Sequence, residues 1–216
     1  STTDDTVLAL TGTCESGATV RVYNGASLLG SATVVGTGWS YNATVANGTT
    51  YQFNATATDA AGNVSAATTA FTVIGDTTGP TTTIATAALS TDSGTSASDF
   101  ITNTASQTIS GTLSANLLSG ETVKVSLNNG STWVDATASV GSNTWSLAGQ
   151  TITSNTLKVK IVDAAGNNGA VFSQAYTLDQ SVPTAQVATA ASALMLEATG
   201  ITNKLDNAPL IAAIGS

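Results

Sequence analysis

The sequence contains no histidine among its 216 residues. This absence removes the side chain that most often acts as a general base near neutral pH, and with it the Ser–His and Cys–His pairs of nucleophilic catalysis. It also removes the commonest protein ligand of transition metals. The glycines are spread as turn punctuation and form no phosphate-binding loop. We therefore expect a protein that is not an enzyme and that binds no organic cofactor.

Cysteine and long apolar runs are equally scarce. Cys14 is the single cysteine, so one chain cannot form an internal disulfide. We expect Cys14 to be a small, buried or half-buried residue in a strand. No segment approaches 18 uninterrupted apolar residues, and we therefore expect no membrane span.

Charged residues make up only 8% of the chain, against about 25% in an ordinary soluble domain. Thr, Ser, Asn and Gly take their place, which suits strand surfaces and turns better than helices. Five Lys and Arg stand against thirteen Asp and Glu, for a net charge of −8. This balance would repel nucleic acid and anionic membranes, and it leaves cations as the natural charged partners.

What the sequence does contain is an internal repeat with a period of about 100 residues. Four separate markers recur with that period, which makes chance similarity a poor explanation. The pairs are Asp59–Asn63 with Asp163–Asn167, Asp76–Pro80 with Asp179–Pro183, Pro80–Ala88 with Pro183–Ala191, and Ile101–Asn103 with Ile201–Asn203.

Short alternating segments, separated by Gly, Asn and Asp turns, fill each repeat. In Ala18–Tyr23 and its counterpart Glu121–Leu127, valines two residues apart face one side, which indicates half-buried strands. Asn24-Gly25 and Asn129-Gly130 follow as hairpin-turn signals. This spacing predicts an all-β fold of tandem immunoglobulin-like Greek-key β-sandwich domains. The other expected strands are Val7–Thr13, Trp39–Val45, Thr49–Thr58, Ala67–Ile74, Gln107–Leu113, Thr144–Leu147, Thr156–Val162 and Val171–Leu178.

Three motifs together resemble the bacterial Ig-like repeats of large adhesins and biofilm-associated surface proteins. They are the linker Asp76-Thr77-Thr78-Gly79-Pro80, the segment Gly12–Val20 (Gly-Thr-Cys-Glu-Ser-Gly-Ala-Thr-Val), and the Asp-Ala-Ala-Gly-Asn motif at 59–63 and 163–167. The resemblance covers residues 1–181. It implies an Ig-like sandwich, repetition in long extracellular stalks, and calcium between domains.

The chain is out of phase with these repeats. We expect residues 1–75 to form an Ig-like domain that lacks its first strand, 76–79 a linker, and 80–179 a complete domain. Residues 180–216 resemble the start of a third repeat. Two interpretations remain open: a piece of a longer array, which we favour, or a filament subunit that donates this segment as the missing strand of a neighbour.

Most acidic residues fall at the expected domain junctions, because the last turn of an Ig-like domain lies beside its preceding linker. Clustered carboxylates repel unless a cation neutralises them, and Ca²⁺ takes six to eight such oxygens. We therefore predict structural calcium, although the Asp-Ala-Ala-Gly-Asn motif is also an ordinary turn. The predicted ligands are Asp4, Asp5, Asp76, Asp163 and Asn167 at the central junction, Asp92, Asp99 and Asp179 at the next, and Asp59 and Asn63 before the first domain.

The expected function is a structural and adhesive spacer of a long secreted or cell-surface protein. Its partners would be neighbouring Ig-like repeats or identical subunits arranged head to tail, with any glycan or surface receptor bound elsewhere in the full protein. A self-assembling filament subunit is the second hypothesis. A carbohydrate-binding module that uses Trp39, Trp133 and Trp145 is the third.

Overall fold

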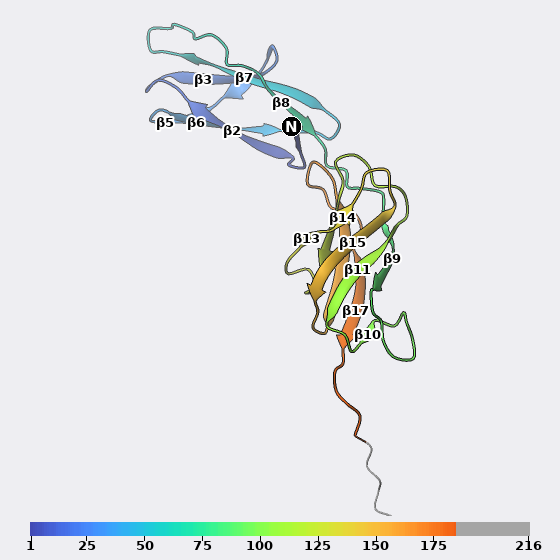
Figure 1. Cartoon of the computed structure of the whole chain (residues 1–216). Helices are drawn as coiled ribbons and strands as arrows, with labels where there is room; N and C mark the ends of the chain where they lie inside the picture. The colour runs from blue at the N-terminus through green and yellow to red at the C-terminus, as the bar shows by residue number, and fades with distance from the viewer. Residues whose placement is uncertain (185–216) are drawn as a thin grey trace, which may run out of the picture. The chain divides into compact units, whose positions relative to one another are not determined.

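A computed structural model describes residues 1–184 of the chain. The segment predicted to begin a third repeat, residues 180–216, lies outside the described residues from 185 onward. Every regular element in the described part is a β-strand, which confirms the all-β prediction. By contacts, Ser1–Gln180 form one compact unit. This unit contains two β-sandwiches that follow one another in sequence (Figure 1).

The first sandwich pairs a five-stranded sheet of order β1-β8-β7-β3-β4 with a three-stranded sheet of order β2-β6-β5. All of its pairings are antiparallel except β1–β8, which are parallel. Its strands are β1 (Thr2–Thr3), β2 (Val7–Thr13), β3 (Thr19–Asn24), β4 (Ser27–Ser31), β5 (Thr33–Val35), β6 (Gly38–Thr44), β7 (Thr50–Thr58) and β8 (Phe71–Gly75).

The second sandwich pairs a sheet of order β10-β17-β16-β12-β13 with a sheet of order β14-β15-β11-β9. The short first strand of the former again runs parallel to the last strand, β10 beside β17. Its strands are β9 (Ile84–Leu89), β10 (Ile101–Thr102), β11 (Ser106–Leu113), β12 (Thr122–Ser126), β13 (Val134–Asp135), β14 (Thr137–Ala138), β15 (Thr144–Thr151), β16 (Asn155–Val162) and β17 (Phe172–Leu178).

Alternation along the strands explains where the core lies. In β16, Leu157, Val159 and Ile161 are buried, while the residues between them face outward. Val123 and Val125 of the neighbouring β12 are buried in the same way. Each such side chain contributes about 1.5–3 kcal/mol when it is fully buried. The period of two that was visible in the sequence therefore places these residues between the sheets.

Two local expectations differ from the structure. The strand expected over Ala67–Ile74 begins only at Phe71. Before it, a side chain takes part in the pairing between Thr68 and Ala55. The Thr68 hydroxyl accepts the Ala55 N–H, and the Thr68 N–H donates to the Ala55 carbonyl. Asn129 and Gly130 both have positive φ, yet they lie in a longer loop between β12 and β13, since the Ser126 hydroxyl accepts the Gly130 N–H at 2.8 Å.

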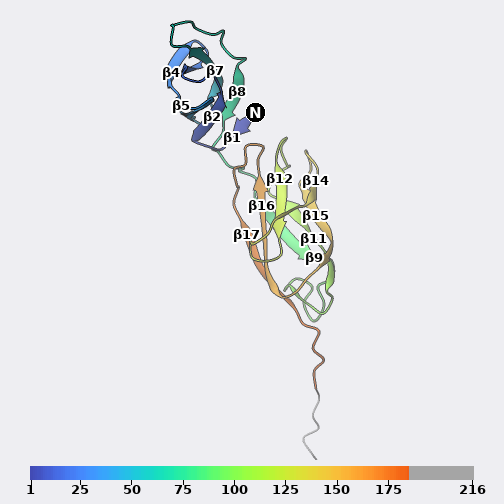
Figure 2. The same cartoon turned by 90° about the vertical axis from the view of Figure 1, so that its left-hand side faces the viewer.

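The two sandwiches differ at one edge. In the second, β11 lies between β15 and β9, as Figures 1 and 2 both show. In the first, the equivalent strand β2 pairs with β6 alone, and the described part of the chain places no strand on its other side. Fifteen buried residues form the core of the second sandwich and six that of the first. Within residues 1–184, the smaller core belongs to the sandwich in which no strand corresponds to β9.

Candidate functional site

The Asp163–Asn167 loop follows β16 and is organised around a single carboxylate. Asp163 Oδ1 accepts the backbone N–H groups of Ala165, Gly166 and Asn167, each at 2.9 Å. Asp163 Oδ2 accepts the side-chain amide of Asn167 at 2.9 Å. Gly166 has a φ of 108°, a conformation that favours glycine. The motif therefore folds as a tight turn closed by its own first and last residues.

The same motif builds the same turn in the first sandwich. Asp59 Oδ1 accepts the N–H groups of Ala61 at 2.9 Å and of Asn63 at 2.8 Å. Its Oδ2 accepts the Asn63 side-chain amide at 2.7 Å. The repeat in sequence is thus a repeat in hydrogen bonding, and the turn forms in both places.

These bonds keep both aspartates ionised. The side-chain and backbone hydrogen bonds from Asn63 hold the pKa of Asp59 below its ordinary value. Partial burial raises the pKa of Asp163, but the bonds from Asn167, Gly166 and Ala165 together outweigh burial and lower it. Both carboxylates therefore carry full negative charge at neutral pH.

The second turn differs from the first because it also contacts the linker and the N-terminal strand. Asn167 Nδ2 donates to the Asp76 carbonyl at 2.8 Å, and the Thr2 hydroxyl donates to the Ala164 carbonyl at 3.2 Å. The Asp4 carboxylate lies against Gly166, where an added Cβ would sit 3.2 Å from Asp4 Oδ2. The structure thus brings Asp4, the Asp76 backbone and the Asp163–Asn167 turn together.

Asn47 of the first sandwich also hydrogen-bonds to the linker. This residue was not among those predicted from the sequence. Its Oδ1 accepts the Thr77 N–H at 2.9 Å, and its Nδ2 donates to the Thr78 hydroxyl at 2.8 Å. Asp76 Oδ1 accepts the Thr78 N–H at 3.1 Å. The only signal in the sequence was Asn47-Gly48, which indicates a turn and gives no partner.

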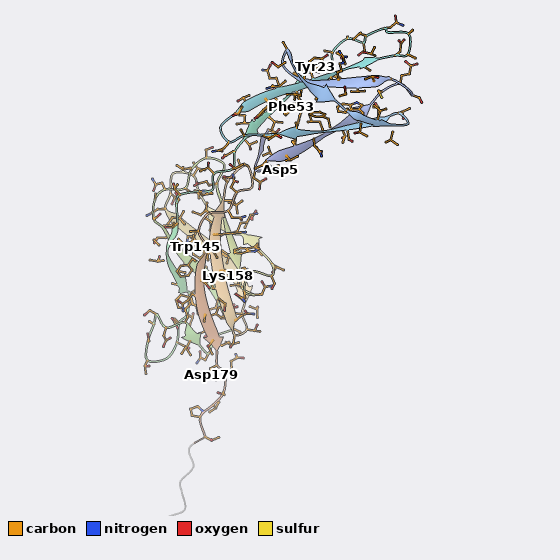
Figure 3. The ribbon with its side chains drawn as sticks, turned by 180° about the vertical axis from the view of Figure 1, so that it is seen from behind. Asp5, Tyr23, Phe53, Trp145, Lys158 and Asp179 are labelled. Carbon is orange, nitrogen blue, oxygen red and sulfur yellow. The ribbon has the colours of Figure 1, made fainter. Side chains whose placement is uncertain are left out.

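Asp5 lies at the end of the first sandwich where the linker begins (Figure 3). Its Oδ2 accepts the Thr3 hydroxyl at 3.2 Å, and its N–H donates to the same hydroxyl oxygen. The Asp5 carboxylate therefore contacts its own loop.

A second acidic group lies at the other end of the second sandwich, where Figure 3 shows Asp179. Asp92 Oδ2 accepts the Phe100 N–H at 3.0 Å, and Asp99 Oδ1 accepts the Ile101 N–H at 3.1 Å. The Asp179 N–H donates to the Thr102 carbonyl at 2.8 Å. Asp92 Oδ1 is buried and has no hydrogen-bond partner among residues 1–184.

The acidic side chains at the linker are not arranged as a metal-binding site. Within residues 1–184, no three Asp, Glu, His or Cys side chains form a group that could hold a metal ion. Three of the four bonds to Asp163 converge on Oδ1, which leaves Oδ2 as its more available oxygen. Oxygen donors of the kind that calcium prefers are gathered at the linker, and the calcium site stays a prediction.

The three tryptophans have different surroundings. Trp145 is 2% exposed and belongs to the core. Trp133 is half-buried, and the Lys160 ammonium lies over its ring at 4.2 Å from the centroid. Trp39 is half-buried beside Gly12. Only Trp39 and Trp133 therefore present part of a ring to solvent, and they belong to different sandwiches.

Comparison with known families matches both sandwiches. A model described as bacterial Ig domain matches residues 2–73, and one described as bacterial Ig-like domain matches residues 78–180. The chain is a tandem of two bacterial Ig-like domains. This confirms the family resemblance seen in the linker, the Gly12–Val20 segment and the Asp-Ala-Ala-Gly-Asn turns.

One solved structure, the first of the three that follow, supports the fold of these Ig-like domains. The fibronectin(III)-like modules of Clostridium thermocellum CbhA align with a TM-score of 0.52 and 14% identity, over 86% of this chain and 92% of theirs. A 1.5-MDa bacterial ice-binding adhesin aligns with a TM-score of 0.32 and 19% identity, over 82% of this chain and 59% of that one. A tetra-tandem repeat from the extending region of a large adhesion protein gives 0.30 and 20%, over 82% and 46%.

No curated protein sequence matches this chain. Among residues 1–184, no helix is long and apolar enough to cross a membrane.

Proposed function

We propose that the two Ig-like domains are a non-enzymatic spacer of a long extracellular cell-surface or biofilm-matrix protein. The observation that carries this proposal is the linker, which is hydrogen-bonded from both sides by Asn47 and Asn167. A flexible tether would need none of these bonds. A linker fixed to the domains that it joins sets the spacing between them, which is what a stalk requires.

The composition supports an extracellular setting. Charged residues are only 8% of the chain, and Thr, Ser and Asn supply most of its polar side chains. The absence of histidine removes the usual catalytic base. A surface that carries a net charge of −8 suits a protein that stays soluble while it attracts cations.

We propose further that calcium stiffens the linker. The carboxylates of Asp4, Asp5 and Asp76, with Asp163 Oδ2 and the Asn167 amide oxygen, would hold the ion. Calcium there would neutralise repelling carboxylates and bridge the linker to the turn that follows it. Because no three acidic side chains are grouped within residues 1–184, Asp5 and Asp76 would have to reorient toward the Asp163–Asn167 turn. At tenfold saturation the ion would stabilise the bound arrangement by about 1.4 kcal/mol.

Small-angle scattering of the 216-residue protein tests this proposal. Adding calcium to about ten times the millimolar dissociation constant expected of extracellular modules should lengthen the particle and reduce its flexibility, and a chelator should reverse both. Asp4→Asn with Asp163→Asn should abolish the response, whereas Asp135→Asn removes the carboxylate that pairs with Lys124, which is not a proposed ligand, and should preserve it. Identical scattering with calcium and with chelator would contradict the calcium proposal.

The hydrogen-bonded linker can be tested separately from calcium. Asn167→Ala removes the bond to the Asp76 carbonyl as well as the bond to Asp163, while Asn63→Ala removes only the equivalent bond to Asp59. In chelator, Asn167→Ala should make the particle more flexible and Asn63→Ala should not. Equal flexibility of both variants would contradict the role of the linker as a fixed spacer.

A further inference from the structure

The first Ig-like domain carries an open groove along β2. Among residues 1–184, β2 is an edge strand whose outer backbone groups face no other strand. A groove of about 540 Å³ lies beside it. Its walls include Leu10 of β2, Trp39 of β6, Phe53 and Ala55 of β7, and Phe71 of β8. Figure 3 shows where Phe53 lies in this domain.

The second domain shows what fills the equivalent groove. There β11 pairs with β9 on its outer side, and β9 also contacts β16 on the facing sheet. The strand register shows which residues of the two domains correspond: Gly12 pairs with Trp39, and Gly111 pairs with Trp145. On the outer side, Gly111 pairs with Ala87 of β9. Gly12 has no such partner in the described residues.

The unfilled groove leaves its lining partly exposed. Trp39 is half-buried, whereas Trp145 is 2% exposed. Leu10 is 9% exposed against 0% for its counterpart Ile109, and Phe71 is 53% exposed. A strand in the groove would cover this apolar surface and pair the open backbone groups of β2.

One segment of the chain repeats the sequence around β9, the strand that fills the equivalent groove of the second domain. Pro183–Ala191 reads Pro-Thr-Ala-Gln-Val-Ala-Thr-Ala-Ala, beside Pro-Thr-Thr-Thr-Ile-Ala-Thr-Ala-Ala in Pro80–Ala88. In β9, Ile84 is buried opposite Leu113 and Thr86 pairs with Thr112. The Thr86 and Thr112 hydroxyls are 2.8 Å apart. Both threonines of this pair have counterparts, at 189 in the segment and at 13 in β2.

We propose that β2 of the first domain binds residues 183–192 of a second copy of this chain as an added antiparallel strand. The register copies that of β9 on β11. Val187 then lies opposite Cys14, Thr189 opposite Thr13, and Ala190 opposite Gly12. One position departs from the template, since Ser192 stands where β9 has Leu89.

Charge favours this occupant. Each copy carries a net charge of −8, which opposes association in general. Residues 183–192 contain no charged side chain, and neither do Val7–Cys14 of the acceptor edge. The proposed contact therefore joins two neutral strands, and the main-chain hydrogen bonds and apolar pockets of strand addition supply the affinity. The pairing does not depend on calcium.

Cys14 makes the proposed register directly testable. In antiparallel pairs, opposed residues bring their Cβ atoms close enough for a disulfide. Val187→Cys in the 216-residue protein should therefore give, under mild oxidation, a ladder of disulfide-linked species on a non-reducing gel. Ala188→Cys is the matched control, because its counterpart Ala85 is exposed and faces away from the core. The ladder should also disappear when Cys14→Ser is combined with Val187→Cys.

Three results would overturn the proposal. Equal ladders from Val187→Cys and Ala188→Cys would show random collision. An oxidised monomer with both thiols consumed would place the donor in the same chain. A protein without cross-links, and with the mass of a monomer at all concentrations in sedimentation equilibrium, would leave the groove to some other polypeptide.

Sedimentation equilibrium gives a second readout without cysteine chemistry. Wild-type mass should rise with concentration. Val187→Asp puts a charge at the buried position and should weaken association at least tenfold, whereas Ala188→Asp puts the same charge at the exposed one and should weaken it far less. Equal effects of the two aspartates would mean that net charge alone governs association, and this would contradict the proposed register.

Discussion

Gly111 of β11 and Gly12 of β2 occupy equivalent positions in the two domains but have different neighbours. At Gly111 an added Cβ would overlap the Thr86 carbonyl oxygen and lie 2.9 Å from Trp145. At Gly12 it would lie 2.7 Å from the Trp39 ring, with no backbone atom among its nearest neighbours. The first glycine therefore admits a neighbouring backbone, and the second only a side chain that can move.

These contacts predict unequal costs for the same substitution. Gly111→Ala should destabilise the second domain by about 3 kcal/mol, because neither the β9 backbone nor buried Trp145 can yield. Gly12→Ala should cost the first domain about 1 kcal/mol, because half-exposed Trp39 can shift. Urea unfolding of the two variants, followed by tryptophan fluorescence, measures both. A larger cost for Gly12→Ala would contradict the difference between the two edges.

At the residue scale, sequence reasoning predicted more of the fold than of the site. Buried valines such as Val123 and Val125 follow from a period of two. The sequence indicates that the Asp163–Asn167 motif is either part of a calcium site or an ordinary tight turn, and the structure shows the turn. The sequence could not show that Asp163 accepts hydrogen bonds mainly from its own turn. Hydrogen-bond partners depend on backbone torsions, and the motif does not specify these.

At the scale of strands, long alternating segments were predicted well and irregular ones poorly. The strand expected over Thr156–Val162 is found as Asn155–Val162, whereas Ala67–Ile74 shortened to Phe71–Gly75. Small residues such as Ala66 and Ala67 bury little surface, so Thr68 and its neighbours follow side-chain hydrogen bonds instead. The edge position of β2 depends on which strands pair, a property that the sequence of β2 does not contain.

The open edge of β2 predicts a difference between two tryptophans. With Trp133→Phe and Trp145→Phe combined, only Trp39 emits, and at micromolar protein acrylamide should quench it several-fold more strongly than it quenches Trp145 in the Trp39→Phe, Trp133→Phe variant. The reason is that Trp39 lines the groove while Trp145 is 2% exposed. Both variants unfolded in urea should quench alike. Equal quenching of the folded forms would mean that the groove is closed.

At the scale of the whole molecule, the lack of histidine predicts how stability depends on pH. The pKa values of Asp59 and Asp163 are lowered in the folded state. Their contribution is therefore complete above the unfolded value of about 3.9 and is lost as pH falls through the lower folded value. The thermal midpoint should be constant between about pH 6 and 8 and should fall below about pH 4.

Replacing both aspartates by asparagine provides the control for this prediction. Asparagine keeps an oxygen that can accept the turn N–H groups but does not titrate in this range. Asp59→Asn with Asp163→Asn should therefore make the acid decline shallower and leave the neutral region unchanged. A midpoint that moves between about pH 6 and 8 would point to a titrating group that these turns do not explain.

The parallel pairing of β1 with β8 has a mechanical consequence. The Ile74 N–H donates to the Ser1 carbonyl and the Asp76 N–H to the Thr3 carbonyl, both at 2.9 Å. Because the two strands point the same way, a pull on Ser1 and Asp76 in opposite directions acts along them, in shear. Both bonds are then loaded together and cannot be unzipped one by one. β1, the shortest strand of the first domain, would thus bear a force applied between Ser1 and the linker.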